Sequence, residues 1–309
     1  MDQLQVKAYA KINLALDVLS KRHDGYHNIR TIMQCLALHD TLEIEKARER
    51  ERSVSVACES SNVPVNETNL AYKAAIRMID TFGLQHGVNI HIHKVIPVSA
   101  GLAGGSSNAA ATLRGINELF GLGLSLYALA DIGKSIGADV PYCVFGGTVL
   151  AEGIGEKLTP LPDHPPISVV LAKPSVEVST SQVFREFAQA DIAGEPDFNT
   201  IINGIRLDNI NEISRGISSG VANVLECVTA ATHPIIHDIK SELMQSGALC
   251  AQMSGSGPTV FAYFTNKAHA VAAAQALRYK LPQITEIYVT CISHVPAWLR
   301  AIPKWNVPK

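Results

Sequence analysis

The sequence predicts an α+β protein of two domains, and three observations predict it. The chain has 309 residues, of which 47% are hydrophobic and 17% charged. Strand-like alternation and helix-like spacing both recur along it, and a proline-rich stretch interrupts it near the middle. A single hydrophobic core stops growing at roughly 250 to 300 residues, so two cores are expected. A composition this apolar excludes a disordered chain.

The first half begins with strand-like segments. Residues 6–17 alternate apolar and polar side chains, with Lys11 and Asn13 on the polar face. Alternation alone favours a solvent-facing stripe there, although a strand lining an anionic site has the same pattern. After a turn at residues 24–27, extended stretches at 32–38 and 41–45 predict a small antiparallel sheet.

A helix and another strand follow. Capping side chains at residues 66–69 precede a helical pattern that ends at Gly83. Residues 88–94 alternate again and place His91 and His93 on one face. With no nearby carboxylate or cysteine cluster in the sequence, we do not expect this histidine pair to bind a metal.

Two helices are predicted next, over residues 107–120 and 125–136, the second opened by a serine cap. Four prolines crowd residues 160–166, which predicts a domain boundary near 160, with domains 1–160 and 161–309. The second half shows a strand, a less regular middle, and then alternating helices and strands, an order typical of an α+β sandwich. The segments are a strand at 167–172, a helix at 234–245, a strand at 259–264, a helix at 267–281 and a strand at 284–292.

The segment with the clearest chemistry is the glycine-rich stretch 97–107, PVSAGLAGGSS, between a strand and a helix. Glycines let the backbone approach a phosphate, and the start of the following helix adds partial positive charge. The stretch is neither a Walker A loop nor a dinucleotide fingerprint. The pattern favours a phosphate cradle over a plain turn. A second glycine turn at 253–258 serves equally well as a tight connection or as part of the same cradle.

One acid stands apart from the helix patterns. Asp139 follows a helix and precedes Pro141, so it is not a charge on a regular helix face. Phosphoryl transfer needs an oriented nucleophile, and Asp139 could serve as its base. Taken alone, this position is more typical of a cap or turn residue.

Composition also limits partners and location. With 26 basic and 28 acidic residues, the net charge of −2 predicts no nucleic-acid partner, and the dense run at 46–52 mixes both signs. Six scattered cysteines are typical of reduced thiols. Residues 1–6 lack the features of a signal peptide, and no apolar stretch reaches membrane-span length. We expect a cytoplasmic protein with no membrane partner; the sequence leaves the oligomeric state open, and a homodimer is compatible with it.

Five motifs in order give the chain a resemblance to a known family. They are residues 10–14 (AKINL), 24–27 (DGYH), 97–107, 137–141 (GADVP) and 253–257 (MSGSG). Together they resemble the GHMP kinase superfamily. The first two, and GLAGGSS in place of the general GLGSSA, are similar to the branch that phosphorylates an erythritol derivative carrying cytidine diphosphate.

The resemblance implies a fold and an activity. The N-terminal domain would be like ribosomal protein S5 domain 2 and the C-terminal domain ferredoxin-like, with the active site in the cleft between them. The enzyme would move the γ-phosphoryl group of ATP to the 2-hydroxyl of the erythritol moiety, in the non-mevalonate route to isoprenoids, with ATP and Mg²⁺ as cofactors. The small-molecule substrate would be cytidine diphosphate methylerythritol.

The resemblance also implies site residues. Lys11 and Asp139 would be catalytic, and it leaves open whether Asp139 acts mainly as a base or by positioning. The substrate would contact Asn13, Tyr26, His27, Thr180 and Phe184. The nucleotide would contact Pro97, Val98, Ser99, Ala100, Gly101, Leu102, Ala103, Gly104, Gly105, Ser106, Ser107, Asn108, Asn69, Lys94, Gly255 and Gly257. Ser107 would be the magnesium ligand.

Two alternatives remain at this point. The chain could be another GHMP small-molecule kinase, acting on homoserine, mevalonate or a sugar. It could also be a catalytically silent relative that binds nucleotide and regulates a partner. The presence of both Lys11 and Asp139 argues against the silent relative.

Overall fold

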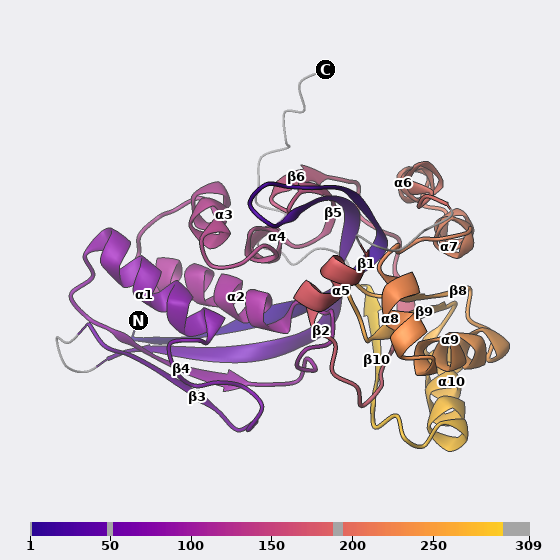
Figure 1. Cartoon of the computed structure of the whole chain (residues 1–309). Coiled ribbons are helices and arrows are strands. Elements are labelled where there is room, and N and C mark those ends of the chain that lie inside the picture. The colour runs from indigo at the N-terminus through magenta and orange to yellow at the C-terminus, as the bar shows by residue number, and fades with distance from the viewer. Residues whose placement is uncertain (1, 48–51, 188–193, 293–309) are drawn as a thin grey trace.

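The computed structural model describes residues 2–47, 52–187 and 194–292 (Figure 1). Residues 48–51 of the mixed charge run lie outside the described residues. No described helix has both the length and the apolar character needed to cross a bilayer. The elements in chain order are β1 (Gln3–Lys21), β2 (His27–Lys46), β3 (Val54–Cys58), α1 (Leu70–Phe82), β4 (Val88–His93), α2 (Gly104–Leu119), α3 (Leu126–Lys134), α4 (Val140–Phe145), β5 (Thr148–Gly153), β6 (Lys157–Pro160), β7 (Ile167–Lys173), α5 (Thr180–Phe187), α6 (Phe198–Arg206), α7 (Ile210–Ser218), α8 (Glu226–Thr232), α9 (Ile235–Gln245), β8 (Cys250–Met253), β9 (Val260–Phe264), α10 (Lys267–Lys280) and β10 (Glu286–Ile292).

The first sheet has the order β3-β4-β2-β5-β6, with β1 paired antiparallel to β2. The two stretches predicted at 32–38 and 41–45 are parts of the single long strand β2. The pairing of β1 with β2 shifts register at three places, the first between Tyr9 and Lys11 and the second between Asn13 and Ala15. Such bulges break strict alternation and turn side chains to the other face. The solvent-facing stripe favoured by alternation is therefore wrong, because Lys11 and Asn13 are only 5% and 1% exposed.

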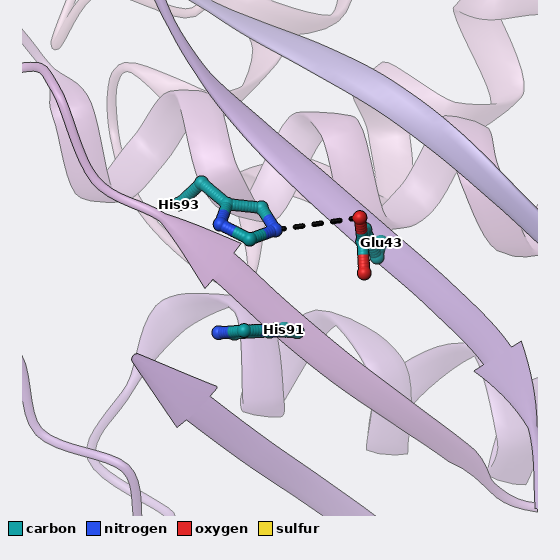
Figure 2. A group of neighbouring side chains, drawn as sticks. All are labelled: Glu43, His91 and His93. Carbon is teal, nitrogen blue, oxygen red and sulfur yellow. Dashed lines mark ion pairs between the residues drawn. The ribbon is translucent and has the colours of Figure 1, made fainter. Parts of the chain in front are cut away.

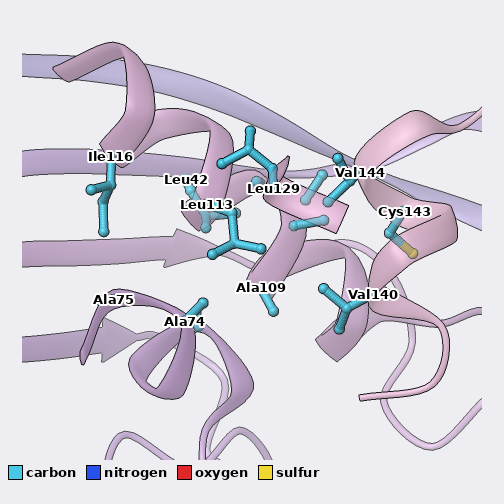
Figure 3. Close-up of a cluster of buried hydrophobic side chains, with 14 of the residues drawn as sticks. Leu42, Ala74, Ala75, Ala109, Leu113, Ile116, Leu129, Val140, Cys143 and Val144 are labelled. Carbon is cyan, nitrogen blue, oxygen red and sulfur yellow. The ribbon is translucent and has the colours of Figure 1, made fainter. Parts of the chain in front are cut away.

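Helices α1 and α2 cover one face of the first sheet, as Figure 1 shows. Small side chains such as Ala74 and Ala109 let the two helices approach closely, while Leu113 and Ile116 pack toward Leu42 of β2 (Figure 3). Each fully buried leucine or isoleucine contributes about 1.5–3 kcal/mol of hydrophobic stabilisation. This core fixes the position of α2, whose first turn includes Gly104 and Gly105 of the loop.

The second sheet has the order β10-β7-β9-β8 and is buried on both faces. Val170 and Ala262 face the core formed with α9 and α10. The next residues along the strands, such as Val169 and Phe261, face a core shared with β1, β2, α6 and α7. A strand buried on both sides needs apolar residues in succession, which explains the continuous run in β7. The helices and strands predicted for this half are present, and the less regular middle contains α5 to α8.

The chain passes from one sheet to the other between β6 and β7, over residues 161–166. His164 pins this connection to both sheets. Its backbone N–H donates to Thr148 Oγ1 of β5 at 3.1 Å, and its ring Nε2 lies 3.2 Å from the hydroxyl of Tyr263 on β9. The division of the chain into domains at residue 160 stays a prediction, because the two sheets share one of the cores.

Burial of His164 predicts a pH-dependent stability. Desolvation lowers the pKa of this imidazole from 6.5 to about 4, so the folded protein keeps it neutral. Its contribution to stability is complete above pH 6.5, where the unfolded chain is also neutral, and is lost as pH falls toward 4. We expect protonation of this imidazole in the unfolded chain to lower the wild type's free energy of unfolding by about 2–3 kcal/mol between pH 7 and pH 4.5. Urea unfolding of wild type and His164→Gln at both pH values measures the difference in slope.

His237→Gln, at an exposed position of α9, is the matched control and should show the wild-type pH slope. Equal slopes for wild type and His164→Gln would contradict the assignment, whatever the absolute stability of the variant at pH 7.

Candidate active site

A cavity of about 510 Å³ lies where β1, the glycine-rich loop, the start of α4 and the start of α5 meet. Sequence-predicted residues from distant parts of the chain line it together. They are Lys11, Asn13, Asn69, Lys94, Pro97, Val98, Ser99, Ala100, Gly101, Ala103, Gly104, Gly105, Ser106, Asn108, Asp139, Thr180, Phe184 and Gly255.

The buried lysine on β1 is held from several sides. At the first bulge, the backbone N–H of Lys11 donates to the carbonyl of Leu102, 3.1 Å away, while Lys11 stays in register with Cys35 of β2. Its ammonium donates to Asn13 Oδ1 at 2.7 Å and lies 3.5 Å from Asp139 Oδ2. The amide of Asn13 donates in turn to Thr31 Oγ1 at 2.8 Å. These bonds fix the ammonium at the cavity wall.

Asp139 stands just before the short helix α4, in the N-cap position, yet its side chain makes no capping hydrogen bond. Asp139 therefore occupies the cap and turn position that the sequence alone favoured, but its side chain is left free of a capping bond. Its carboxylate is 31% exposed and is the sole carboxylate among the described residues that line the cavity. A carboxylate beside an ammonium, with one side open to the cavity, can accept a proton from a bound hydroxyl group.

The glycine-rich loop turns by three residues in the left-handed region, Ser99, Gly101 and Ala103, and leads into α2. The helix begins at Gly104, three residues earlier than predicted, so the second half of the glycine stretch is its first turn. The first N–H groups of a helix have no partner within it, and Ala103 at the N-cap has no side-chain acceptor to offer. The N–H groups of Gly104, Gly105 and Ser106 are thus available to an anion.

The second glycine turn packs directly against the first. Ser254 Oγ donates to the carbonyl of Gly101 at 3.0 Å and accepts from the N–H of Asn13 at 3.3 Å. Buried Asn223 donates to the carbonyls of Met253 and Gly255, which holds the turn from behind. The sequence did not decide whether this turn is only a tight connection or part of the phosphate cradle. The contacts place it in the same site as the glycine-rich loop.

Asp40 anchors the entry to the glycine-rich loop and is completely buried. Its carboxylate accepts hydrogen bonds from the N–H groups of Val95 and Ile96, from Asn108 Nδ2 and from Lys94 Nζ, all at 2.8 Å. The ammonium of Lys94 is thereby engaged within the protein while the residue still lines the cavity. No sequence motif drew attention to Asp40.

Asn69 has a comparable structural duty. As the N-cap of α1, its Oδ1 accepts from the N–H of Ala71 at 2.8 Å, and its amide donates to the carbonyl of Pro64. Residues on either side of it, including Asn62, Thr68 and Leu70, also line the cavity and were missed by sequence reasoning.

Phe184 lines another part of the cavity, and a second ring packs on it. His27 stacks on Phe184 with ring centroids 5.2 Å apart and planes inclined by 26°. His27 is 8% exposed, and its buried Nε2 has no hydrogen-bond partner among the described residues. Desolvation lowers the pKa of this imidazole. Tyr26, the neighbouring residue, is 57% exposed, and Thr180 at the start of α5 shares a hydrogen bond with Ser256 at 2.8 Å.

Some predicted site residues do not line the cavity. Leu102 is a core residue, and Gly257 shapes the second turn through a bond from its N–H to the carbonyl of Ser254. Ser107 is 2% exposed and donates its hydroxyl hydrogen to the carbonyl of Tyr9 at 2.7 Å. Tyr26 and His27 also do not line the cavity, although the ring of His27 stacks on Phe184, which does.

This combination of fold and site defines a class of protein. The family model for the N-terminal domain of GHMP kinases matches residues 69–147, and that for the C-terminal domain matches residues 201–283. A crystal structure of homoserine kinase from Cytophaga hutchinsonii is similar over 94% of this chain and 95% of that one, with a TM-score of 0.75 at 21% identity, which shows the shared fold. The protein is an ATP-dependent kinase of this class.

The nearer relatives are more specific. The 4-diphosphocytidyl-2-C-methyl-D-erythritol kinase of Caldicellulosiruptor bescii is 47% identical over 93% of this chain and 98% of its own, and that of Acetivibrio thermocellus is 48% identical over 90% and 96%. A crystal structure of 4-(cytidine 5'-diphospho)-2C-methyl-D-erythritol kinase matches 93% of this chain and 98% of that one, with a TM-score of 0.77 at 29% identity. The chain belongs to the 4-diphosphocytidyl-2-C-methyl-D-erythritol kinase family.

Close packing of the two glycine turns leads to a prediction for Gly101→Ala. A Cβ atom at Gly101 would lie 2.3 Å from the carbonyl oxygen of Ser254, so the turns must separate. We expect ATP affinity to fall about tenfold or more and the protein to lose about 2–4 kcal/mol of unfolding free energy, because backbone atoms are displaced and positive φ is strained. Calorimetric ATP titration and urea unfolding measure both effects.

Gly123→Ala is the matched control. Gly123 also has positive φ, +67° against +72° for Gly101, but a Cβ atom there meets nothing within 4 Å. It should show only the backbone cost of about 1–2 kcal/mol and unchanged ATP affinity. Equal effects in the two variants would contradict a role for turn packing in ATP binding.

Proposed function

We propose that the protein transfers the γ-phosphoryl group of ATP to the 2-hydroxyl of 4-diphosphocytidyl-2-C-methyl-D-erythritol, a step in the non-mevalonate route to isoprenoid precursors. The observation that carries this proposal is the Lys11–Asp139 pair, 3.5 Å apart, on the wall of a cavity that the glycine-rich loop also lines. The high identity to relatives named for this substrate supports the choice of acceptor.

Asp139 has the geometry of the group that takes the proton. In the proposed reaction the substrate hydroxyl gives its proton to this carboxylate as its oxygen bonds to the γ-phosphorus. The bond from that phosphorus to the bridging oxygen of ADP breaks, and ADP leaves. In the loose transition state of phosphoryl transfer little base strength is needed, so Asp139 contributes by orienting the hydroxyl as well as by accepting the proton.

Lys11 has two duties in this proposal. Its ammonium holds the Asp139 carboxylate in place, and it offsets negative charge on the transferring phosphoryl group. Because Asn13 Oδ1 accepts one of its three hydrogens at 2.7 Å, the remaining hydrogens are directed toward Asp139 and the cavity. Asn13 in turn cannot rotate freely, since its amide is engaged by Thr31.

The triphosphate is proposed to lie on the free N–H groups at the start of α2. Mg²⁺ usually binds through one or two carboxylates together with substrate phosphates, and a single carboxylate, Asp139, lines the described cavity. The residues present fit such an ion if the phosphates supply most of its ligands. Bound there, Mg²⁺ would neutralise phosphate charge. Ser106, which lines the cavity, is better placed to assist than the predicted ligand Ser107.

The cytosine ring is proposed to bind between Tyr26 and Phe184, with its polar edge toward His27. A neutral imidazole has one donor and one acceptor, and the lowered pKa of His27 keeps it in that form at neutral pH. Its buried Nε2, unpaired among the described residues, needs a partner such as the cytosine edge provides. These features favour a pyrimidine nucleotide over homoserine, mevalonate or a sugar, none of which has a flat π face.

A substrate panel decides between this proposal and the other GHMP acceptors. Turnover of homoserine, mevalonate or a sugar without turnover of the cytidyl substrate would overturn it. ATP binding without turnover of any acceptor would favour the silent regulator. A cytoplasmic location, the absence of nucleic-acid partners and a homodimer stay predictions from the sequence.

For Asp139→Asn we expect kcat to fall about 10²–10⁴-fold, the usual contribution of a general base, with ATP affinity within about threefold of wild type. Steady-state kinetics with the cytidyl substrate and calorimetric ATP titration measure the two quantities. Asp131→Asn, at an exposed acid of α3 whose carboxylate pairs only with Lys134 among the described residues, is the matched control. An unchanged kcat in Asp139→Asn would remove Asp139 from the mechanism.

For Tyr26→Ala we expect KM for the cytidyl substrate to rise about 5- to 150-fold, since stacking on a base is worth about 1–3 kcal/mol. KM for ATP should change little. Because Tyr26 is exposed, its truncation should not unfold the protein, and Tyr279→Ala on α10, 88% exposed, is the matched control. Equal changes in both Michaelis constants would contradict a cytosine contact.

A further inference from the structure

The open face of the first sheet carries a cluster of imidazole and carboxylate groups that the kinase reaction does not use. The alternating strand β4 places His91 and His93 on the same face, and Glu43 lies directly opposite His91 on β2. Ala57 of β3 pairs with His91, so Glu59, two residues further along, lies on this face beside His93. The side chains between them, Ile90 and Ile92 among others, point into the core under α1 and α2.

The side chains converge as well as share a face. His93 Nε2 lies 3.4 Å from a Glu43 oxygen, and its Nδ1 lies 3.6 Å from a Glu59 oxygen, which is also 2.6 Å from His91 Nε2. Figure 2 shows Glu43 and both rings gathered across the two strands. One ligand atom from each of Glu43, His91 and His93 falls within a sphere where all lie less than 4.8 Å apart.

We propose that Glu43, His91 and His93 form a binding site for one divalent transition-metal ion of the Zn²⁺ type, with the exposed carboxylate of Glu59 turning to supply the fourth ligand. Imidazole nitrogen and carboxylate oxygen are ligands that Zn²⁺ prefers, at about 2.0–2.2 Å in tetrahedral geometry. Tetrahedral bonds of that length put ligand atoms roughly 3.4 Å apart, which matches the 3.4 Å between His93 Nε2 and the Glu43 oxygen. The side chains are 31–62% exposed, so they can change rotamer to close the site without moving the strands.

The carboxylates also balance the ion's charge. Two glutamates and two neutral imidazoles around a divalent ion give a neutral site, which does not concentrate charge on the sheet. The sequence disfavoured a metal here for want of a nearby carboxylate. Glu43 and Glu59 are 48 and 32 positions away from His91 in the chain, and only strand pairing brings them to it.

The test is Zn²⁺ binding by the full chain, purified without a histidine tag and in the absence of nucleotide. Titration calorimetry with Zn²⁺ alone should give one saturable site per chain, and Co²⁺ at that site should show the visible absorption of a tetrahedral ion. His91→Ala, His93→Ala and the isosteric Glu43→Gln should each weaken binding by about tenfold or more.

His269→Ala, at an exposed histidine of α10 outside the cluster, should bind Zn²⁺ as the wild type does. Circular dichroism checks that each variant is folded. We expect each to fold, because the substituted side chains are partly exposed. Absence of saturable Zn²⁺ binding by wild type would overturn the proposal. Unchanged binding by the His91→Ala/His93→Ala double variant would overturn it equally.

Discussion

The buried carboxylate of Asp40 is the interaction on which the phosphate-binding half of the site depends. A completely buried charge costs several kcal/mol in lost hydration, and here four donors offset that cost. These donors come from residues 94–96, directly after β4, and from α2, the two elements that the glycine-rich loop connects. Asp40 thus ties together the two ends of the loop. Breaking such a network by removing one partner typically costs about 3–5 kcal/mol.

The catalytic side of the cavity rests on a different constraint, the bulges of β1. In a regular strand, Lys11 and Asn13 would share the exposed face of Lys7. The shift at Lys11 instead frees its N–H to bind Leu102 of the glycine-rich loop, while the N–H of Asn13 meets Ser254 of the second turn. One strand therefore sets the distance between the lysine, the phosphate cradle and the second turn.

Much of this architecture could be predicted from sequence. Alternation, capping residues and glycines predicted most strands and helices, because these are local effects. The glycine-rich loop and the special position of Asp139 were also visible locally. The features that the sequence did not predict depend on long-range pairing. They are the burial of Lys11 and Asn13, the role of Asp40, and the carboxylates beside His91. A lone acid in a strand pattern has no local sign that four donors from elsewhere will surround it.

The link between Asn13 and Ser254 also bears on how the protein is made. These residues are 241 positions apart, yet their hydrogen bond closes the centre of the site. During synthesis the first strand leaves the ribosome long before the second glycine turn exists. The first sheet and its helices can pack early, since their contacts lie within the first 160 residues. Contacts of such large sequence separation form slowly because the intervening chain must be ordered first. The catalytic centre is therefore completed only when nearly the whole chain has emerged, and a product truncated before residue 253 would carry the lysine and the glycine-rich loop without the second turn that packs against them.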